Sequence, residues 1–277
     1  KYLEFTNRDV DLVAAILRMA VAVEVIVLTT ENISLNGIPE SMSLSASTLS
    51  LNEITLSADL ANFAPRGDQL ENLCLSWCDI TDSVISSLCS FPNLRALDLT
   101  SAIFETEDYL SVLVSSCGDK LTELYLYYCV PILPLVTVQE VLPLFTRLES
   151  FSLRLEDKNT AVWHMSSFSR LLKLQIYYSG GYNDRLMSQL TEHCHENIRE
   201  LSLRIAAPDL AAEQLDILVS TCTKLRSLNL DNIRTNPPCY TEEDKERWKS
   251  LRPGLVVGGD CEHVLNVLDR FDRSGEW

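Results

Sequence analysis

Leucine residues recur along the chain in the spacing LxxLxL. Clear copies of this unit follow one another at steps of 23 to 27 residues, and they begin at Leu70, Leu94, Leu121, Leu148, Leu171, Ile198 and Leu225. Within a unit apolar and polar residues alternate, which predicts a short strand, and the next apolar residues have the spacing of a helix. One strand and one helix of this size cannot bury their apolar faces alone. The units are therefore expected to stack and share a continuous core.

Weaker copies of the unit extend the array toward both ends of the chain. These additional copies are Val23-Ile26-Leu28, Leu51-Ile54-Leu56, and Leu255 with Val257. We therefore predict about nine to ten repeats over residues 23–260, clearest between 70 and 230. Residues 1–22 and 261–277 are predicted to form capping helices, because the open ends of a stacked sheet and core need a cover.

The segment from Leu70 to Cys89, LENLCLSWCDITDSVISSLC, resembles the leucine-rich repeats of the cysteine-containing subtype. That repeat runs roughly CxxLxxLxLxxCxxITDxxLxxL and is best known from F-box proteins, which recruit substrates to ubiquitin ligases. The resemblance implies an α/β fold, a right-handed leucine-rich-repeat solenoid (a horseshoe) with a parallel concave sheet and helices on the convex face, as in ribonuclease-inhibitor-like proteins. Residues 1–22 do not resemble an F-box, because its Leu-Pro opening and its tryptophan are missing.

The cysteines follow the repeat. Nine cysteines would suggest disulfides in a secreted protein, but six of them occupy equivalent positions: the loop cysteines Cys78 and Cys129, and the helix-end cysteines Cys89, Cys117, Cys194 and Cys222. A buried free cysteine packs as a small hydrophobe. We therefore expect reduced thiols, each packed within its own coil, and from them a cytoplasmic or nuclear location.

The formal net charge of −16 argues against nucleic acid as the main partner, because phosphate binding needs a basic surface. It favours a protein partner with basic patches, although the same charge would also keep a long solenoid soluble. The sequence contains no apolar run of 18 residues, so no membrane-spanning segment is expected.

Motifs that carry catalysis or hold cofactors are missing: the sequence contains no GxxxxGK[ST], HExxH, GxSxG or CxxC. His193-Cys194-His195 has residue types that bind metals, but Cys194 is expected at a core position and no second ligand cluster lies within reach. We therefore predict no metal, no cofactor and no enzymatic activity.

The residues between the strand leucines are expected to point away from the core, onto the concave face. An aromatic and basic patch is predicted there from Glu123, Tyr125, Tyr127, Arg154, Lys173, Tyr177 and Arg204. Tyrosine and arginine are enriched among interface hot spots, so this patch could bind an acidic peptide, a phosphorylated segment or a carboxylate terminus. Alternatively, these side chains stack on one another and only stiffen the coil. Insertions after Arg154 and Tyr177 are further candidates for binding loops.

These features favour a protein-interaction module that is not an enzyme. The most specific version, by resemblance, is a substrate-recognition component of a cullin-type ubiquitin ligase. Three other roles use the same fold: an inhibitor that wraps a basic enzyme, a regulatory scaffold, and the ligand-sensing repeat domain of an immune receptor.

Overall fold

The computed structural model describes residues 2–6, 23–29, 46–56, 60, 68–133, 135–155, 170–178, 184–193, 196–205, 212–231 and 240–258. The chain divides into two compact units, which are described one at a time. Unit 1 comprises the described residues up to Pro131 together with Leu144–Arg147. Unit 2 comprises Ile132–Pro143 and the described residues from Leu148 onward.

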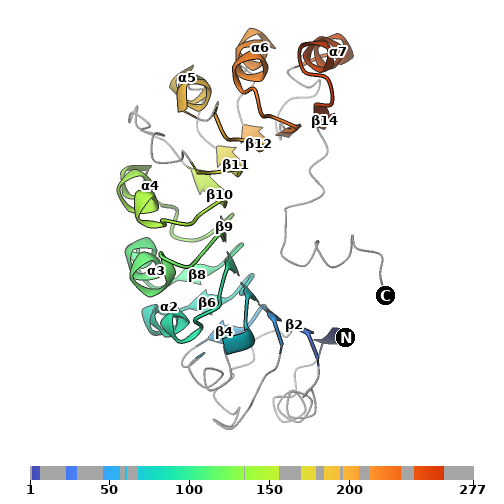
Figure 1. The fold of residues 1–277 in the computed structure, drawn as a ribbon. Helices are drawn as coiled ribbons and strands as arrows, with labels where there is room; N and C mark the ends of the chain where they lie inside the picture. The colour runs from blue at the N-terminus through green and yellow to red at the C-terminus, as the bar shows by residue number, and fades with distance from the viewer. Residues whose placement is uncertain are drawn as a thin grey trace. The chain divides into compact units, whose positions relative to one another are not determined.

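Unit 1 is built on parallel strands that follow one another in sequence order. These strands are β1 (Tyr2–Thr6), β2 (Val25–Thr29), β3 (Thr48–Asn52), β5 (Asn72–Cys74), β7 (Ala96–Asp98) and β9 (Glu123–Leu126). A second, smaller sheet contains β4 (Thr55–Leu56), β6 (Asp79–Ile80) and β8 (Ile103–Phe104). Its helices are α2 (Asp82–Ser87), η3 (Leu88–Ser90) and α3 (Tyr109–Cys117), all on one side of the main strands (Figure 1).

Unit 2 repeats the same strand and helix order. Its parallel strands are β10 (Ser150–Leu155), β11 (Lys173–Tyr178), β12 (Glu200–Ile205), β13 (Ser227–Asp231) and β14 (Val256–Gly258). Its helices are α4 (Leu135–Val141), α5 (Asp184–His193), α6 (Ala212–Thr221) and α7 (Glu242–Leu251), and α5, α6 and α7 lie on one side of the strands (Figure 1). The short helix η4 (Leu142–Leu144) follows α4. In both units we call the sheet face away from the helices the open face.

The repeated leucines explain this architecture. Leu73, Leu97 and Leu124 pair in register across β5, β7 and β9, and all three are fully buried. Leu174, Leu201 and Leu228 form the matching ladder of unit 2. Within each unit, each coil therefore adds its leucines to a continuous core, and the predicted α/β leucine-rich-repeat solenoid is confirmed.

Two weak copies of the unit were placed in the wrong register. Leu49 and Leu51 are the inward residues of β3, because Leu49 pairs with Leu73, whereas Leu56 belongs to the smaller sheet. At the other end, Val257 pairs with Leu228, the second apolar position, and not with the third. Irregular loop lengths caused both errors. The first is a shift of five residues, because Leu49 and not Ile54 is the second apolar position. The second is a shift of two residues, which preserves the inward alternation.

The N-terminal prediction was wrong where it can be tested. Residues Tyr2–Thr6 form a strand, with Leu3 paired to Ile26 and Phe5 paired to Leu28, so a further strand precedes β2 where a helix was predicted. Leu3 and Phe5 are separated by one residue, which is the apolar spacing of a strand. The remainder of the predicted N-terminal cap and the whole of the predicted C-terminal helix, 261–277, lie outside the described residues.

A left-handed turn after each of the strands β3, β5, β7 and β9 explains the loop cysteines. Glu53, Trp77, Ser101 and Tyr128 have φ between 59° and 61°, and in each case the following residue turns inward and is buried. Cysteine fits this position because it is small and its thiol can donate a hydrogen bond. Cys78 donates to the carbonyl of Leu51 at 3.2 Å and Cys129 to that of Leu99 at 3.1 Å, each in the preceding coil.

The described cysteines are free thiols. Cys74, Cys78, Cys117, Cys129 and Cys222 are buried, but Cys89 is exposed, so the prediction that every repeat cysteine packs in its coil is wrong for Cys89. The reason is that α2 ends at Ser87 and a short η3 turn follows it, which rotates Cys89 away from the core.

Basic side chains in one coil cap the carbonyl groups at the helix end of the preceding coil. Lys120 Nζ donates to the carbonyl oxygens of Leu88 and Phe91, both at 2.8 Å. Hydrogen bonds from charged donors to such carbonyls are stronger than neutral ones. Lys120 therefore joins two successive coils of unit 1.

We expect Lys120→Met to lower the free energy of unfolding by about 1–3 kcal/mol, because it removes two charge-assisted hydrogen bonds while keeping the aliphatic stem. Urea denaturation followed by circular dichroism measures this change. Lys249→Met is the matched control: Lys249 pairs only with Glu246 on the surface of α7, and such a pair contributes less than about 1 kcal/mol. Equal losses in the two variants would contradict the capping role.

Candidate functional site: a cationic row on the open face of unit 2

Successive strands of unit 2 bring Arg154, Tyr177 and Arg204 into one row. Arg154 of β10 pairs in register with Tyr177 of β11, and Tyr177 pairs with Arg204 of β12. The guanidinium carbons of Arg154 and Arg204 lie 5.3 and 5.5 Å from the centroid of the Tyr177 ring. Both distances fall within the range of cation–π attraction. We call these three residues the cationic row.

The register of the strands produces this row. Arg154, Tyr177 and Arg204 each directly follow a buried apolar residue of their strands, Leu153, Ile176 and Leu203 in that order. Adjacent strands lie about 5 Å apart, so residues at equivalent positions become lateral neighbours. All three side chains are partly exposed. The stacking contacts that the sequence suggested as one alternative are therefore present, and the side chains still reach the surface.

A row of neutral polar residues lies beside the cationic row, two residues earlier along each strand. Ser152, Gln175 and Ser202 pair in register there, and they supply hydroxyl and amide groups without charge. Further toward the strand start, Lys173 forms an ion pair with Glu200 at 2.9 Å. The charge of Lys173 is thus matched by Glu200, and the two arginines of the predicted patch, Arg154 and Arg204, are the basic residues that contact the Tyr177 ring.

The other three predicted residues, Glu123, Tyr125 and Tyr127, belong to β9 and the turn after it in unit 1. Tyr125 and Tyr127 are only 3% and 1% exposed, so the expectation that their rings face outward toward a partner is wrong. The Tyr125 hydroxyl donates to Glu123 Oε2 at 2.8 Å, and the Tyr127 ring packs edge-on against Tyr128 at 4.3 Å. The alternation of apolar and polar residues predicted correctly the face of the sheet on which these side chains lie. It did not predict how neighbouring side chains cover one another.

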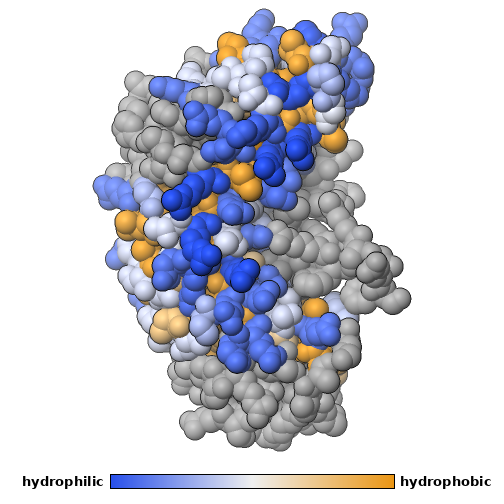
Figure 2. Space-filling view, viewed as in Figure 1, coloured by the Kyte–Doolittle hydropathy of each residue, from blue (hydrophilic) through white to orange (hydrophobic). Residues whose placement is uncertain are grey.

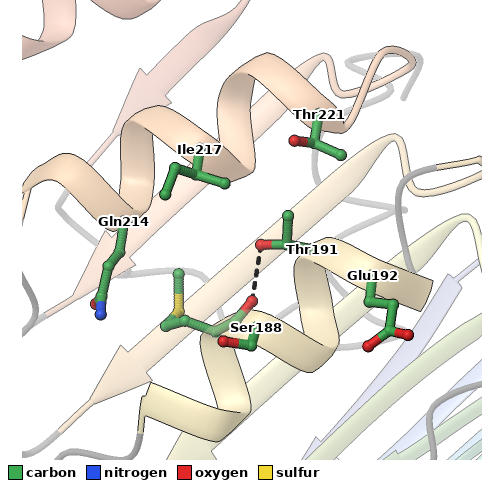
Figure 3. A pocket seen from close by; sticks show the side chains of 7 residues that line it. Ser188, Thr191, Glu192, Gln214, Ile217 and Thr221 are labelled. Carbon is green, nitrogen blue, oxygen red and sulfur yellow. Dashed lines mark hydrogen bonds between the residues drawn. The ribbon is translucent and has the colours of Figure 1, made fainter.

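A groove on the helical face of unit 2 lies between α5 and α6 (Figure 3). It has a volume of about 470 Å³ and is lined by Met187, Ser188, Thr191, Glu192, Gln214, Ile217 and Thr221. Thr191 Oγ1 donates to the Met187 carbonyl at 2.7 Å, which is a local helix contact. Among the described residues that line it, Glu192 is the single ionisable one, so these residues offer no pair of groups for acid–base chemistry.

Several exposed apolar side chains were not predicted from the sequence. Trp77 is 67% exposed at its left-handed turn, and Ile103 and Val130 are about half exposed and bridge to each other in register. Trp77 occupies the turn position that holds Glu53, Ser101 or Tyr128 in the other coils. A large apolar residue at this turn position is the sequence signal that could have identified it. On the viewed face, apolar residues form separate areas between hydrophilic ones (Figure 2).

Several expectations about sites fall outside the described residues. Cys194, His195 and most of the insertions after Arg154 and Tyr177 belong to this part of the chain. Within the described ranges, no group of three or more His, Cys, Asp or Glu side chains could hold a metal ion. Across the same ranges, no helix is long and apolar enough to cross a bilayer.

Comparisons with known proteins found resemblance only at the level of solved structures. No family model matches the chain, and no curated protein matches it. Among solved structures, internalin C2 of Listeria monocytogenes is 17% identical with a TM-score of 0.41, and the match covers 74% of this chain and 80% of internalin C2.

Two further solved structures have comparable scores. An internalin (InlF) of Listeria monocytogenes is 16% identical with a TM-score of 0.42, covering 91% of this chain and 70% of that one. The leucine-rich-repeat structure of FLRT2, solved in an octameric complex with Latrophilin 3 and Unc5D, is 14% identical with a TM-score of 0.39, covering 86% and 83%. Similarity of this size does not constrain the function of this chain.

Proposed function

We propose that this chain is a protein-interaction module whose cationic row binds an acidic, extended segment of a partner protein. The observation that carries the proposal is the in-register arrangement of Arg154, Tyr177 and Arg204 with both guanidinium groups against one ring. The tyrosine ring holds the two guanidinium groups in defined positions, which reduces the side-chain entropy lost on binding. Arginine donates bidentate hydrogen bonds to carboxylates and phosphates.

The charge of the surrounding unit supports an acidic ligand. The described residues up to Pro131 include thirteen carboxylates and only two basic side chains, Arg95 and Lys120. The described residues of unit 2 have nearly equal numbers, thirteen carboxylates and twelve basic side chains. A strongly acidic chain therefore carries its basic groups mainly in unit 2, where the cationic row is found.

The spacing of the row defines the ligand further. Arg154 and Arg204 are two strands apart, so their backbones are separated by about 10 Å. Two acidic groups that are separated by three residues in a polyproline-II segment are about 9 Å apart and face the same side. The best ligand is then an extended segment with carboxylate or phosphate groups at positions i and i+3, crossing the strands over Tyr177.

Binding of short labelled peptides tests this proposal. We expect a proline-rich peptide with glutamates at i and i+3 to bind at least about tenfold more tightly than a peptide of the same composition with adjacent glutamates. Arg154→Ala and Arg204→Ala should each weaken binding about tenfold or more, and Tyr177→Leu should do so more than Tyr177→Phe. Fluorescence anisotropy at low ionic strength measures all of these affinities.

Lys249→Ala on α7 is the control for this experiment, because it removes a surface charge of unit 2 far along the chain from the row. It should leave peptide affinity unchanged. The proposal fails if the two peptides bind equally, or if Arg154→Ala and Arg204→Ala bind as the unaltered chain does while retaining its circular dichroism spectrum.

A narrower role as the substrate-recognition component of a cullin-type ubiquitin ligase rests on the resemblance of Leu70–Cys89 to the cysteine-containing repeat. In that role the acidic segment would be a degradation signal in the substrate, and ubiquitylation of the captured partner would be lost in the Arg204→Ala variant. An inhibitor of a basic enzyme is the competing role. It would instead use the acidic surface of unit 1, and Arg204→Ala would leave its binding intact.

A further inference from the structure

A second positive site lies at the other end of the unit 2 strands. A pocket of about 420 Å³ is lined by Arg199, Thr223, Lys224, Leu225, Arg226, Leu251, Arg252 and Pro253. Four of these eight residues are basic and none is acidic. We call this the edge pocket. On a chain with a net charge of −16, such a concentration of one sign in a single hollow raises the local concentration of anions.

The repeat itself places two of the arginines side by side. Arg199 and Arg226 each follow the first apolar residue of their units, Ile198 and Leu225. The Arg226 amide donates to the Arg199 carbonyl at 2.7 Å, so the two backbones are direct lateral neighbours. Both side chains are exposed. Like charges in this arrangement repel each other, and a bound anion would remove that cost.

The other two basic residues are held in place by the protein. Arg252 donates through Nη2 to the Val219 carbonyl at 3.0 Å and to the Ser220 carbonyl, and through Nη1 to the Thr223 carbonyl. Lys224 Nζ donates to Asn197 Oδ1 at 3.2 Å. Arg252 thus caps the end of α6 and keeps its charge at the pocket wall, while Arg199 and Arg226 remain as the two groups able to turn toward a ligand.

The edge pocket is separate from the cationic row. Arg199 precedes Arg204 by five residues along β12, which corresponds to about 16 Å in a strand. The ion pair of Lys173 with Glu200 lies between them. Among the lateral neighbours of Arg199 on adjacent strands, the nearest residue with a carboxylate is Glu149, which lies two strands away. The Leu172 amide donates to the Glu149 carbonyl, and the Arg199 amide donates to the Leu172 carbonyl.

We propose that the edge pocket binds a phosphate-bearing ligand through Arg199 and Arg226, with Lys224 and Arg252 supplying fixed positive charge. The guanidinium groups of two arginines can bind two phosphate groups, or two sides of one phosphate group. The pocket volume is sufficient for a small phosphate ester. The ligand class is therefore a multiply charged phosphate, either free in solution or attached to a peptide. This inference does not depend on the proposed function of the cationic row.

Titration of the full chain with inorganic pyrophosphate, followed by isothermal calorimetry and by thermal unfolding, tests the proposal. We expect saturable binding that raises the unfolding temperature. Arg199→Gln and Arg226→Gln should each weaken binding about tenfold. Without ligand both variants should unfold at a temperature equal to or above that of the unaltered chain, because they relieve the repulsion between neighbouring arginines.

Lys249→Gln is the matched control, since it removes a basic residue of unit 2 that pairs with Glu246 on α7 and is not among the residues that line the edge pocket. It should leave pyrophosphate binding unchanged. A phosphoserine peptide titrated in parallel separates the two sources: tighter binding than pyrophosphate indicates a phosphorylated protein, and weaker binding indicates a free phosphate compound. The proposal is overturned if pyrophosphate does not bind saturably, or if the Arg199→Gln, Arg226→Gln double variant binds it as well as the unaltered chain does.

Discussion

The free energy of unfolding is expected to fall by about 7 kcal/mol between pH 8 and pH 10, because five buried thiols stay protonated in the folded chain. Burial raises the pKa of Cys74, Cys78 and Cys117 to about 12 and that of Cys222 to about 11. The pKa of Cys129 is raised as well, first by burial and then by the nearby charge of Asp98. The ordinary pKa of a cysteine thiol is 9.0.

The direction of this effect follows from proton release. Below about pH 9 the thiols are protonated in both states, and their contribution to stability is complete. Above it the unfolded chain releases protons that the folded chain retains, so the unfolded state gains stability as the pH rises toward the folded pKa values. Each thiol then contributes a loss of between about 1 and 2 kcal/mol at pH 10. The sum is comparable to the total stability of many domains.

Urea denaturation at pH 8, 9 and 10 in the presence of a reducing agent measures the loss. Four of the five thiols, Cys74, Cys78, Cys117 and Cys129, are in unit 1, so the variant with alanine at these four positions should lose most of the pH dependence. Cys89→Ala is the control, because Cys89 is exposed and should not alter the slope. An unchanged slope in the fourfold variant would show that other groups cause the alkaline loss.

The second large effect is expected for Trp248→Ala, which should lower the free energy of unfolding by about 3–5 kcal/mol. Trp248 is a residue of α7 and is fully buried. Its indole Nε1 donates to Asp216 Oδ1 of α6 at 2.6 Å, and its ring lies 5.7 Å from that of Tyr240. Arg247 donates to the same Asp216 oxygen at 2.8 Å. The substitution therefore creates a cavity and removes one of the hydrogen bonds that join α7 to α6.

Because each repeat contacts only its neighbours, this loss should be local. Hydrogen exchange should show faster exchange in α7 and α6, with little change in unit 1. Trp77→Ala provides a tryptophan control, since Trp77 is largely exposed and surface substitutions change stability by no more than about 0.5 kcal/mol. A uniform increase in exchange throughout the chain would contradict the local model.

The candidate site shows which steps of sequence reasoning succeed. Arg154, Tyr177 and Arg204 could be placed on one face and in one row, because identical positions in regular repeats become lateral neighbours. Tyr125 and Tyr127 were placed on the correct face by the same rule but were wrongly expected to be exposed. The hydroxyl contact of Tyr125 with Glu123 and the edge-on packing of Tyr127 with Tyr128 depend on rotamers, which no repeat pattern specifies.

The edge pocket was missed although its arginines stand in the sequence at equivalent positions. Arg199 and Arg226 are 27 residues apart, one full repeat, and comparison of the position after the first leucine in each unit would have paired them. Arg252 could not have been added in this way. It reaches the pocket because the last coil is longer, with Val257 paired to Leu228, and because its guanidinium turns back to cap α6.

The sequence by itself determined the repeated α/β fold, since leucines at a fixed spacing can be buried only by stacking coil on coil. It also determined which residues become neighbours wherever the loops keep their length. Only the tertiary structure decided the register of the irregular coils, the strand at Tyr2–Thr6, the burial of Tyr125 and Tyr127, and the pocket around Arg226. The physical reason is that inward alternation fixes the direction of a side chain, whereas exposure and charge clustering depend on contacts between residues far apart in the chain.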